Sequence, residues 1–193
     1  MRDIEAVKKD LETLKPTHFV TKWVMETTPY IFEENPMEYI LWRENIAQQI
    51  NTDPTDILIS GSACLGFSLN PSKNFKLFDE RSDIDVCIIS PYYFDTAWRE
   101  LLRLNPNNLR GKMRSALVDH RTRLIYWGTI ATDRILPLLS FGPSWDKTIR
   151  ESRSLKTLED RDINFRIYKD RRSMREYLIQ GLEKCKESIW EGE

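Results

Sequence analysis

Three short runs rich in β-branched residues, set apart by longer stretches with helical spacing, constrain the fold of this chain most strongly. The runs cover residues 56–60, 83–90 and 162–168. Their length and composition predict strands. The stretches around them place apolar residues three or four positions apart, which is typical of amphipathic helices. The sequence therefore predicts an α/β (α+β) fold in which helices flank a small sheet.

The order of these elements divides the chain into three parts. Residues 1–55 form a helical N-terminal extension, residues 56–168 hold the three strands, and residues 169–193 contain a closing helix. Helices are expected over residues 3–15, 17–32, 37–50, 63–69, 92–104, 109–139 with a break near Gly128, 144–152 capped by Ser144, and 173–190. No internal repeat or long linker interrupts the 193 residues, so we expect one domain, 1–193.

Composition points to a cytoplasmic protein without membrane contact. No apolar run approaches the roughly 18 residues that a membrane-spanning helix needs, and the first residues lack the apolar segment of a secretory signal. Cys64, Cys87 and Cys185 show no paired spacing and are expected to be buried free thiols. The two histidines leave little from which to build a catalytic triad or a histidine-rich zinc site.

Charge is distributed unevenly along the chain, although its formal net value is -1. Residues 99–153 contain eleven Lys or Arg against five Asp or Glu, a surplus of six. Such a basic middle region attracts a triphosphate or a nucleic acid. The alternative is a set of solvated helix faces, and both interpretations stay open.

Asp83 and Asp85 form the first candidate site. They are separated by one residue in a predicted strand, so their carboxylates point to the same face while Ile84 and Val86 point into the core. Two carboxylates so close repel one another unless a cation lies between them. Oxygen ligands of this kind suit Mg²⁺, which also keeps waters and takes ligands from substrate phosphates. The pair therefore predicts a metal site.

Gly61 and Ser62 follow the first predicted strand directly and precede a short helix. At such a junction, backbone N–H groups and a hydroxyl can hold a phosphate, and glycine lets the phosphate approach closely. A phosphate cradle beside a metal pair is what phosphoryl transfer requires, because its catalysis is mostly charge neutralisation and alignment. An ordinary turn next to a solvated strand end is the alternative interpretation.

These residues resemble the signature of the polymerase-β-like nucleotidyltransferase superfamily. That signature is Gly-Ser after a strand and then Asp-x-Asp on the next, commonly preceded by Ser. Here it reads Gly61-Ser62 followed by Ser82-Asp83-Ile84-Asp85, and Gly66 lies near a place where the family often has glycine. The resemblance covers about residues 56–168 and points to small bacterial members, including defence and toxin-type transferases and antibiotic nucleotidylyltransferases.

The resemblance implies a mixed sheet, two Mg²⁺ ions with Mn²⁺ as a substitute, and an NTP such as ATP as donor. Gly61, Ser62 and Ser82 would bind the nucleotide. The enzyme would transfer a nucleoside monophosphate to RNA, a protein hydroxyl or a small molecule, with release of pyrophosphate. The alternative is a catalytically inactive relative that binds nucleotide or has a regulatory role.

The family also implies a third carboxylate on a later strand, which holds metal and supports deprotonation of the acceptor. We assign it to Asp162, which starts the third predicted strand on the face opposite Ile163. Asp162 would project toward Asp83 and Asp85 if its strand were antiparallel to theirs. The other candidates that stay open are Glu159, Asp160, Asp119 and Asp133.

One departure from the family is the distance between the two motifs. Ser62 and Asp83 lie 21 positions apart, which leaves residues 70–80 as an extra loop. Lys73 and Lys76 of this loop either contact phosphate or are simply solvated. Trp145, close to Lys147 and Arg150 in sequence, is a candidate for stacking on a base or a core residue.

Overall fold

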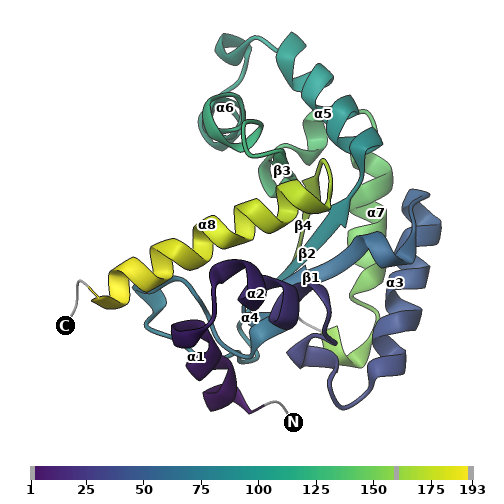
Figure 1. The fold of residues 1–193 in the computed structure, drawn as a ribbon. Helices are drawn as coiled ribbons and strands as arrows, with labels where there is room; N and C mark the ends of the chain where they lie inside the picture. Colours follow the sequence, from purple (N-terminus) through teal and green to yellow (C-terminus); the bar gives the residue numbers. More distant parts are fainter. Residues whose placement is uncertain (1–2, 159–160, 191–193) are drawn as a thin grey trace.

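The computed structural model describes residues 3–158 and 161–190, in which helices surround a four-stranded sheet (Figure 1). The strands are β1 (Ile57–Ser60), β2 (Ile84–Ile89), β3 (Thr129–Ala131) and β4 (Ile163–Tyr168). Their order in the sheet is β1-β2-β4-β3. β2 and β4 are parallel, whereas β1 and β3 run antiparallel to their neighbours, so the sheet is mixed and the predicted α+β fold is confirmed.

Local capping signals explain where several helices begin. The helices are α1 (Ile4–Thr13), α2 (Pro16–Val20), α3 (Pro36–Ile50), α4 (Gly61–Leu65), α5 (Pro91–Arg103), α6 (Gly111–Asp119), α7 (Gly142–Ser152) and α8 (Arg171–Trp190). The side chains of Asp3, Asn35 and Ser90 accept hydrogen bonds from backbone N–H groups in the first turns of α1, α3 and α5. Proline occupies an early position in α3 and α5, where its missing N–H costs nothing.

One face of the sheet is apolar and lies against α7, which packs in turn on α3 (Figure 1). The ring of Trp145 in α7 lies 5.7 Å from the ring of Phe165 in β4. Nε1 of Trp42 in α3 donates a hydrogen bond over 3.1 Å to the carbonyl of Ser152, at the end of α7. α7 and α3 therefore form a helical layer that covers the apolar face of the sheet.

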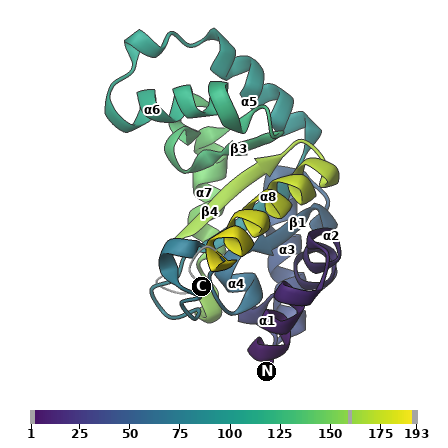
Figure 2. The same ribbon diagram turned by 60° about the vertical axis from the view of Figure 1, so that its left-hand side comes forward.

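The opposite face carries polar side chains and is crossed diagonally by α8 (Figure 2). Nη1 of Arg166 in β4 donates to the hydroxyl of Tyr177 in α8 over 3.0 Å, and Tyr168 packs 5.9 Å from the same tyrosine ring. Burial falls along the strands toward the start of β2, where Asp85 is accessible to solvent. The open end of this face is therefore the end that carries the predicted site.

The predicted helix over residues 109–139 is wrong beyond α6. The chain forms a π-helical turn at His120–Leu124 and then the strand β3, which the sequence analysis missed. His120 is buried and bridges the two, because its ring accepts a hydrogen bond from the Ala131 N–H over 3.1 Å and lies 2.6 Å from the Ala116 carbonyl. Gly128 precedes β3 with a φ of +65°, a conformation that ends helical geometry.

Three other helix predictions are corrected. The stretch over residues 17–32 is not one helix, because α2 passes into a π-helical turn that ends at Met25, and a separate 3-10 turn follows at Tyr30–Phe32. Ser144 is not the cap of α7, which begins at Gly142 without a side-chain cap. The closing helix begins two residues earlier than expected, at Arg171.

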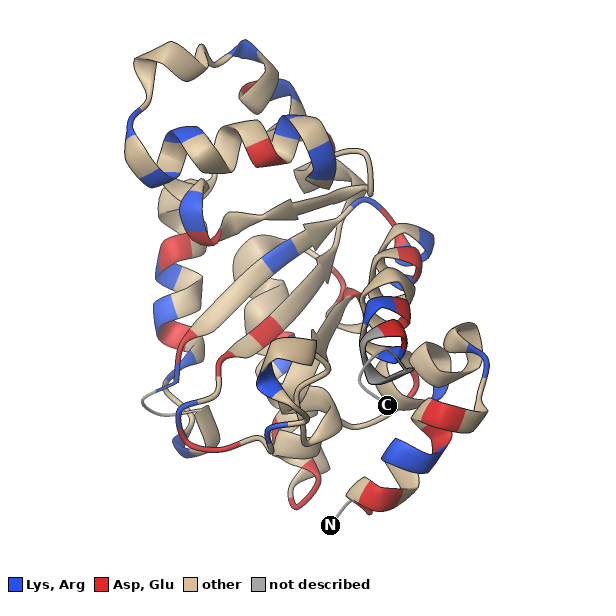
Figure 3. Ribbon diagram, turned by 90° about the vertical axis from the view of Figure 1, so that its left-hand side faces the viewer, with Lys and Arg blue, Asp and Glu red and all other residues tan. Residues whose placement is uncertain are grey.

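The basic middle region lies largely on a lobe formed by α5 and α6, which projects beyond the β3 edge of the sheet (Figures 1 and 3). Between Leu101 and Val118 the chain has four Lys or Arg and no Asp or Glu. Arg121 ties the lobe together, because its Nη2 donates to the carbonyl oxygens of Leu101 and Leu104 at the end of α5. None of the helices in the described ranges is long and apolar enough to cross a membrane.

Candidate functional site

A pocket of about 300 Å³ opens at the start of β2. It is lined by the junction between β1 and α4, by the first residues of β2, and by the loop between them. Five of the six residues predicted from the sequence line this pocket, namely Gly61, Ser62, Ser82, Asp83 and Asp85. The two motifs, 21 positions apart in sequence, therefore meet at one site.

Gly61 lies directly against the carboxylate of Asp85. The antiparallel register of β1 and β2 pairs Ser60 with Asp85, so the residue after Ser60 crosses the end of β2. Gly61 has a φ of +66°, and a Cβ atom added to it would lie 2.8 Å from Oδ2 of Asp85. Both the backbone conformation and the close approach require glycine here.

Asp83 and Asp85 are free to take a ligand. Within the described part of the chain, neither carboxylate forms an ion pair or a hydrogen bond. Asp85 is reached from solvent through the pocket mouth, yet protein atoms crowd it, and this burial raises the pKa of Asp85 above its ordinary value. Repulsion from Asp83 raises the pKa further, while Arg166 and Lys73 oppose the shift.

Ser82 lines the pocket, but its hydroxyl is engaged in the turn before β2. Its Oγ accepts from the Asp79 N–H over 3.1 Å and donates to Oδ1 of Asp79 over 3.0 Å. Nη1 of Arg161 donates to the carbonyls of Asp79 and Ser82, and its guanidinium lies 4.6 Å from the ring of Phe78. Arg161 therefore anchors the loop that leads into Asp83.

Asp162 lies beside Asp83 in the sheet but turns its carboxylate away. The condition for Asp162 to project toward Asp83 and Asp85, an antiparallel strand, is not met, since β4 runs parallel to β2 and pairs Ile163 with Ile84. The Ile84 N–H donates to the Asp162 carbonyl over 2.8 Å, whereas Oδ1 of Asp162 lies 3.5 Å from Nη2 of Arg153. No three Asp, Glu, His or Cys side chains gather at a metal-binding distance in the ranges 3–158 and 161–190.

The neighbour of Asp85 on β4 is Asn164, an amide. Asp133, just after β3, is near enough to contribute to the raised pKa of Asp85. Asp119 is engaged elsewhere, because Arg123 binds both of its oxygens at 2.9 Å. The other two open candidates, Glu159 and Asp160, lie outside the described residues.

Trp145 and the cysteines play no part in this pocket. Trp145 is fully buried between Tyr93 and Phe165, with ring distances of 4.8 and 5.7 Å, so it is a core residue and not a base-stacking one. The three cysteines are buried free thiols, as the sequence predicts. Burial raises the pKa of Cys87 to about 11, so it stays a neutral thiol near pH 7.

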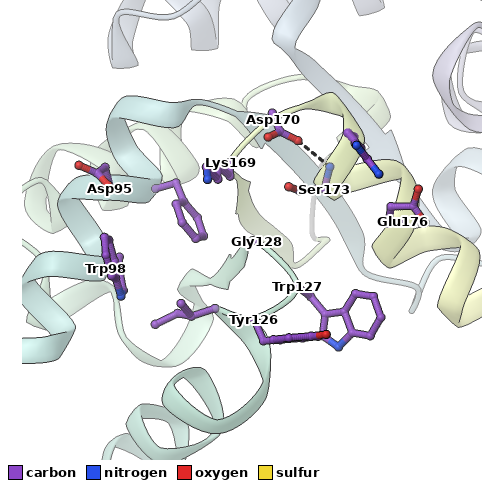
Figure 4. Close-up of a pocket in the computed structure, with 12 residues that line it drawn as sticks. Asp95, Trp98, Tyr126, Trp127, Gly128, Lys169, Asp170, Ser173 and Glu176 are labelled. Atoms are coloured by element: carbon purple, nitrogen blue, oxygen red, sulfur yellow. Dashed lines mark hydrogen bonds between the residues drawn. The ribbon is translucent and has the colours of Figure 1, made fainter.

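A second pocket, of about 480 Å³, lies at the opposite end of β4, between α5, the turn before β3 and the start of α8 (Figure 4). Two of its three acids have structural partners, and Glu176 is the third. Oδ2 of Asp95 accepts from Nε of Arg99 over 2.9 Å, and Oδ1 of Asp170 caps α8 by accepting from the Ser173 N–H over 2.7 Å. The larger pocket therefore offers less unengaged acid chemistry than the pocket at Asp83 and Asp85.

The smaller pocket combines two unengaged carboxylates with a glycine backbone and basic side chains from Lys73 and Arg81. Such a combination can hold a divalent cation together with a phosphorylated ligand.

Comparisons with known proteins found no relative of this chain. Neither a protein-family model, nor a curated protein, nor a solved structure matches the chain.

Proposed function

We propose that the protein is a Mg²⁺-dependent nucleotidyltransferase that works in the cytoplasm on an NTP such as ATP. The observation that carries this proposal is the meeting of Asp83 and Asp85, both unengaged, with the backbone of Gly61 in one pocket. Two neighbouring carboxylates with no ion-pair partner among the described residues repel one another unless a cation binds between them. The resemblance of these residues to polymerase-β-like transferases supports the same assignment.

The donor set fits a hard divalent ion. Asp83 and Asp85 supply oxygen ligands, and the raised pKa of Asp85 reflects a site that favours a neutralising charge. The described side chains supply only two such ligands here, and phosphate oxygens and water would complete the shell of Mg²⁺ or Mn²⁺. When bound, one or two such ions would neutralise phosphate charge and favour ionisation of the acceptor hydroxyl.

The residues of the chain would then bind the phosphates and accept the proton of the acceptor. Ser62 and the backbone at Gly61 would hold phosphate oxygens by hydrogen bonds, with Ser82 placed at the pocket edge. The acceptor oxygen would form a bond to the α-phosphorus as the bond to the β-phosphate oxygen breaks, releasing pyrophosphate. Asp162 would take the acceptor proton on a carboxylate oxygen after leaving Arg153.

A separate cavity of about 580 Å³ would give the acceptor a place to bind. It is lined by Asp133, Asp146, Arg153 and Asn164 together with mainly apolar side chains. Asn164 is the strand partner of Asp85, although this cavity shares no lining residue with the pocket at Asp83 and Asp85. Its size suits a small molecule or the end of a larger one, such as RNA or a protein segment.

The alternative is a nucleotide-binding or regulatory module without turnover. Two observations favour it: Asp85 has the amide Asn164 beside it, and Asp162 pairs with Arg153. An amide cannot act as a base. In this alternative the pocket would bind Mg²⁺ and NTP, and the bound state itself would be the signal.

Two measurements test the proposal. Titration calorimetry with ATP and Mg²⁺ should show binding that disappears when either Asp83 or Asp85 is replaced by Asn. Incubation with each radiolabelled NTP in a native lysate should place label in RNA, protein or a small molecule, with release of pyrophosphate. Binding without labelling would favour the module without turnover, and no binding to any NTP would reject both.

A further inference from the structure

The extra loop between the two motifs is a hairpin that forms one wall of the pocket. The Phe78 N–H donates to the Gly66 carbonyl over 2.8 Å, and the Ser68 N–H donates to the Lys76 carbonyl over 2.9 Å. Phe67 and Leu77 form an antiparallel bridge between these bonds. The tip of this hairpin, residues 70–75, therefore stands on a two-stranded base and is not an unsupported loop.

The tip contains two consecutive residues in the left-handed region of the backbone. Asn74 has a φ of 42° and Phe75 a φ of 52°. Asparagine tolerates this conformation, but for phenylalanine it is unfavourable. The Phe75 ring is half-buried and packs 5.8 Å from the ring of Phe67 at an interplanar angle of 60°. Burial of the ring against the hairpin base thus offsets the unfavourable backbone.

Other contacts fix the turn that precedes these residues. The side chain of Asn70 accepts from the Ser72 N–H over 3.0 Å and from the Ser72 hydroxyl over 2.9 Å. α8 packs against the 3-10 turn Pro71–Lys73. Backbone strain that the surroundings maintain in this way is characteristic of positions that present a side chain to a ligand.

The side chain presented here is Lys73. It lines the pocket that contains Asp83 and Asp85, and no described residue forms an ion pair with it. Its positive charge acts on Asp85, whose pKa it lowers against the effect of burial. Lys76, on the same hairpin, differs because its ammonium binds Oδ2 of Asp79 at 2.8 Å. Lys73 is therefore available to a ligand in the pocket, whereas Lys76 is held in an ion pair.

We propose that Lys73 binds the terminal phosphates of the NTP and the pyrophosphate released from it, and that the Asn74–Phe75 turn positions it for this task. This inference rests on the proposed function and adds a cationic phosphate-binding residue to the uncharged groups of Gly61 and Ser62. The carboxylates of Asp83 and Asp85 repel a triphosphate, and the positive charge of Lys73 in the same pocket offsets part of that repulsion beside any bound Mg²⁺. An ammonium ion donates up to three hydrogen bonds to phosphate oxygens.

Calorimetry on the full chain with Mg²⁺ and three probes, ATP, inorganic pyrophosphate and AMP, tests the assignment. Lys73→Met should weaken ATP and pyrophosphate binding by about ten- to hundredfold, the effect of losing a charge-assisted hydrogen bond, and leave AMP binding unchanged. Lys73→Arg should restore most of the affinity. Lys112→Met is the control, with the same charge change at an exposed position on α6 outside the pocket, and should keep wild-type affinity for all three probes.

A second variant tests the turn. Phe75→Ala removes the ring that holds the left-handed conformation, so it should weaken pyrophosphate binding as Lys73→Met does, while the protein still unfolds in one cooperative thermal transition at a somewhat lower midpoint. Trypsin should also cut this variant faster after Lys73, and pyrophosphate should protect the wild type from that cut. Wild-type affinities in Lys73→Met would overturn the assignment, whereas a wild-type protein that binds no probe would overturn the proposed function itself.

Discussion

A Cβ atom at Gly61 would lie 2.8 Å from Oδ2 of Asp85, closer than a real side chain can approach. The backbone of the first motif is therefore packed against the carboxylate of the second. The contact is possible because Ser60 and Asp85 are register partners and Gly61 turns across the strand end with a φ of +66°. A ligand bound between the two motifs therefore contacts the backbone of Gly61, which carries no side chain.

Replacing Gly61 by Ala should disrupt the contact between Gly61 and Asp85 in two ways. The left-handed conformation should cost about 1–2 kcal/mol of unfolding free energy, and the methyl group should displace Asp85. Gly111→Ala is the matched control, because Gly111 has a φ of +53° but open space around its Cβ position. Both variants should lose similar stability in urea denaturation, and only Gly61→Ala should lose Mg²⁺-dependent ATP binding. Equal binding by both variants would contradict the role of Gly61.

Asp85→Asn should stabilise the metal-free protein at neutral pH while abolishing its response to Mg²⁺ and ATP. The folded protein raises the pKa of Asp85 above 3.8, so the stability associated with this group is complete below 3.8 and is lost as the pH rises through the folded-state pKa. Asparagine does not ionise, so the Asp85→Asn variant does not lose this stability at neutral pH. Asp53→Asn is the contrasting control, because hydrogen bonds from Thr55 lower the pKa of Asp53 and its removal should destabilise. Thermal unfolding at pH 7 with and without Mg²⁺ measures both effects.

Asp162→Asn should separate binding from chemistry. If Asp162 accepts the proton of the acceptor, ATP affinity should stay within a few-fold of wild type while turnover falls by about two to four powers of ten. Asp95→Asn is the control, because Asp95 also forms an ion pair with an arginine, Arg99, at 2.9 Å, but lies outside both the pocket and the acceptor cavity. Full turnover in Asp162→Asn would move the search for the base to Asp133, Glu159 or Asp160.

His120 should make the stability of the protein depend on pH. Burial lowers the pKa of His120 below 6.5, against the opposing effect of its backbone hydrogen bonds with Ala116 and Ala131. Its stabilising contribution is therefore complete above pH 6.5 and is lost as the pH falls toward the folded-state pKa. His120→Gln, which cannot titrate, should show a flatter dependence of unfolding free energy between pH 5 and 8. A wild-type slope in His120→Gln would contradict this assignment.

The elements that the sequence predicted best are those with a strong local pattern. The runs ending at Ser60, Ser90 and Tyr168 became β1, β2 and β4 because their apolar residues alternate or cluster and Gly or Pro follows two of them. β3 has only three residues and follows a helix without a clear break in hydrophobic spacing. Its strand conformation depends on pairing with β4 and on His120, both of which are tertiary contacts.

The candidate site was predictable as far as its two short motifs, Gly61-Ser62 and Asp83-Ile84-Asp85, which both line the pocket. Alternation within one strand places Asp83 and Asp85 on one face, and both line the pocket. The orientation of β4 and the contact of Asp162 with Arg153 depend on how distant segments pack, which local pattern does not encode. Trp145 was ambiguous for the same reason, since a tryptophan near Lys and Arg in sequence can still be buried in the core.

The parallel pairing of β2 with β4 also affects how the protein folds during its synthesis on the ribosome. It joins Ile84 to Ile163, which are 79 positions apart, so β2 waits with one edge unpaired until β4 has been synthesised. Contacts of such long sequence separation form slowly, and an open apolar strand edge promotes aggregation in the meantime. Substitutions in β4 should therefore lower the yield of soluble newly made protein even where the mature protein tolerates them.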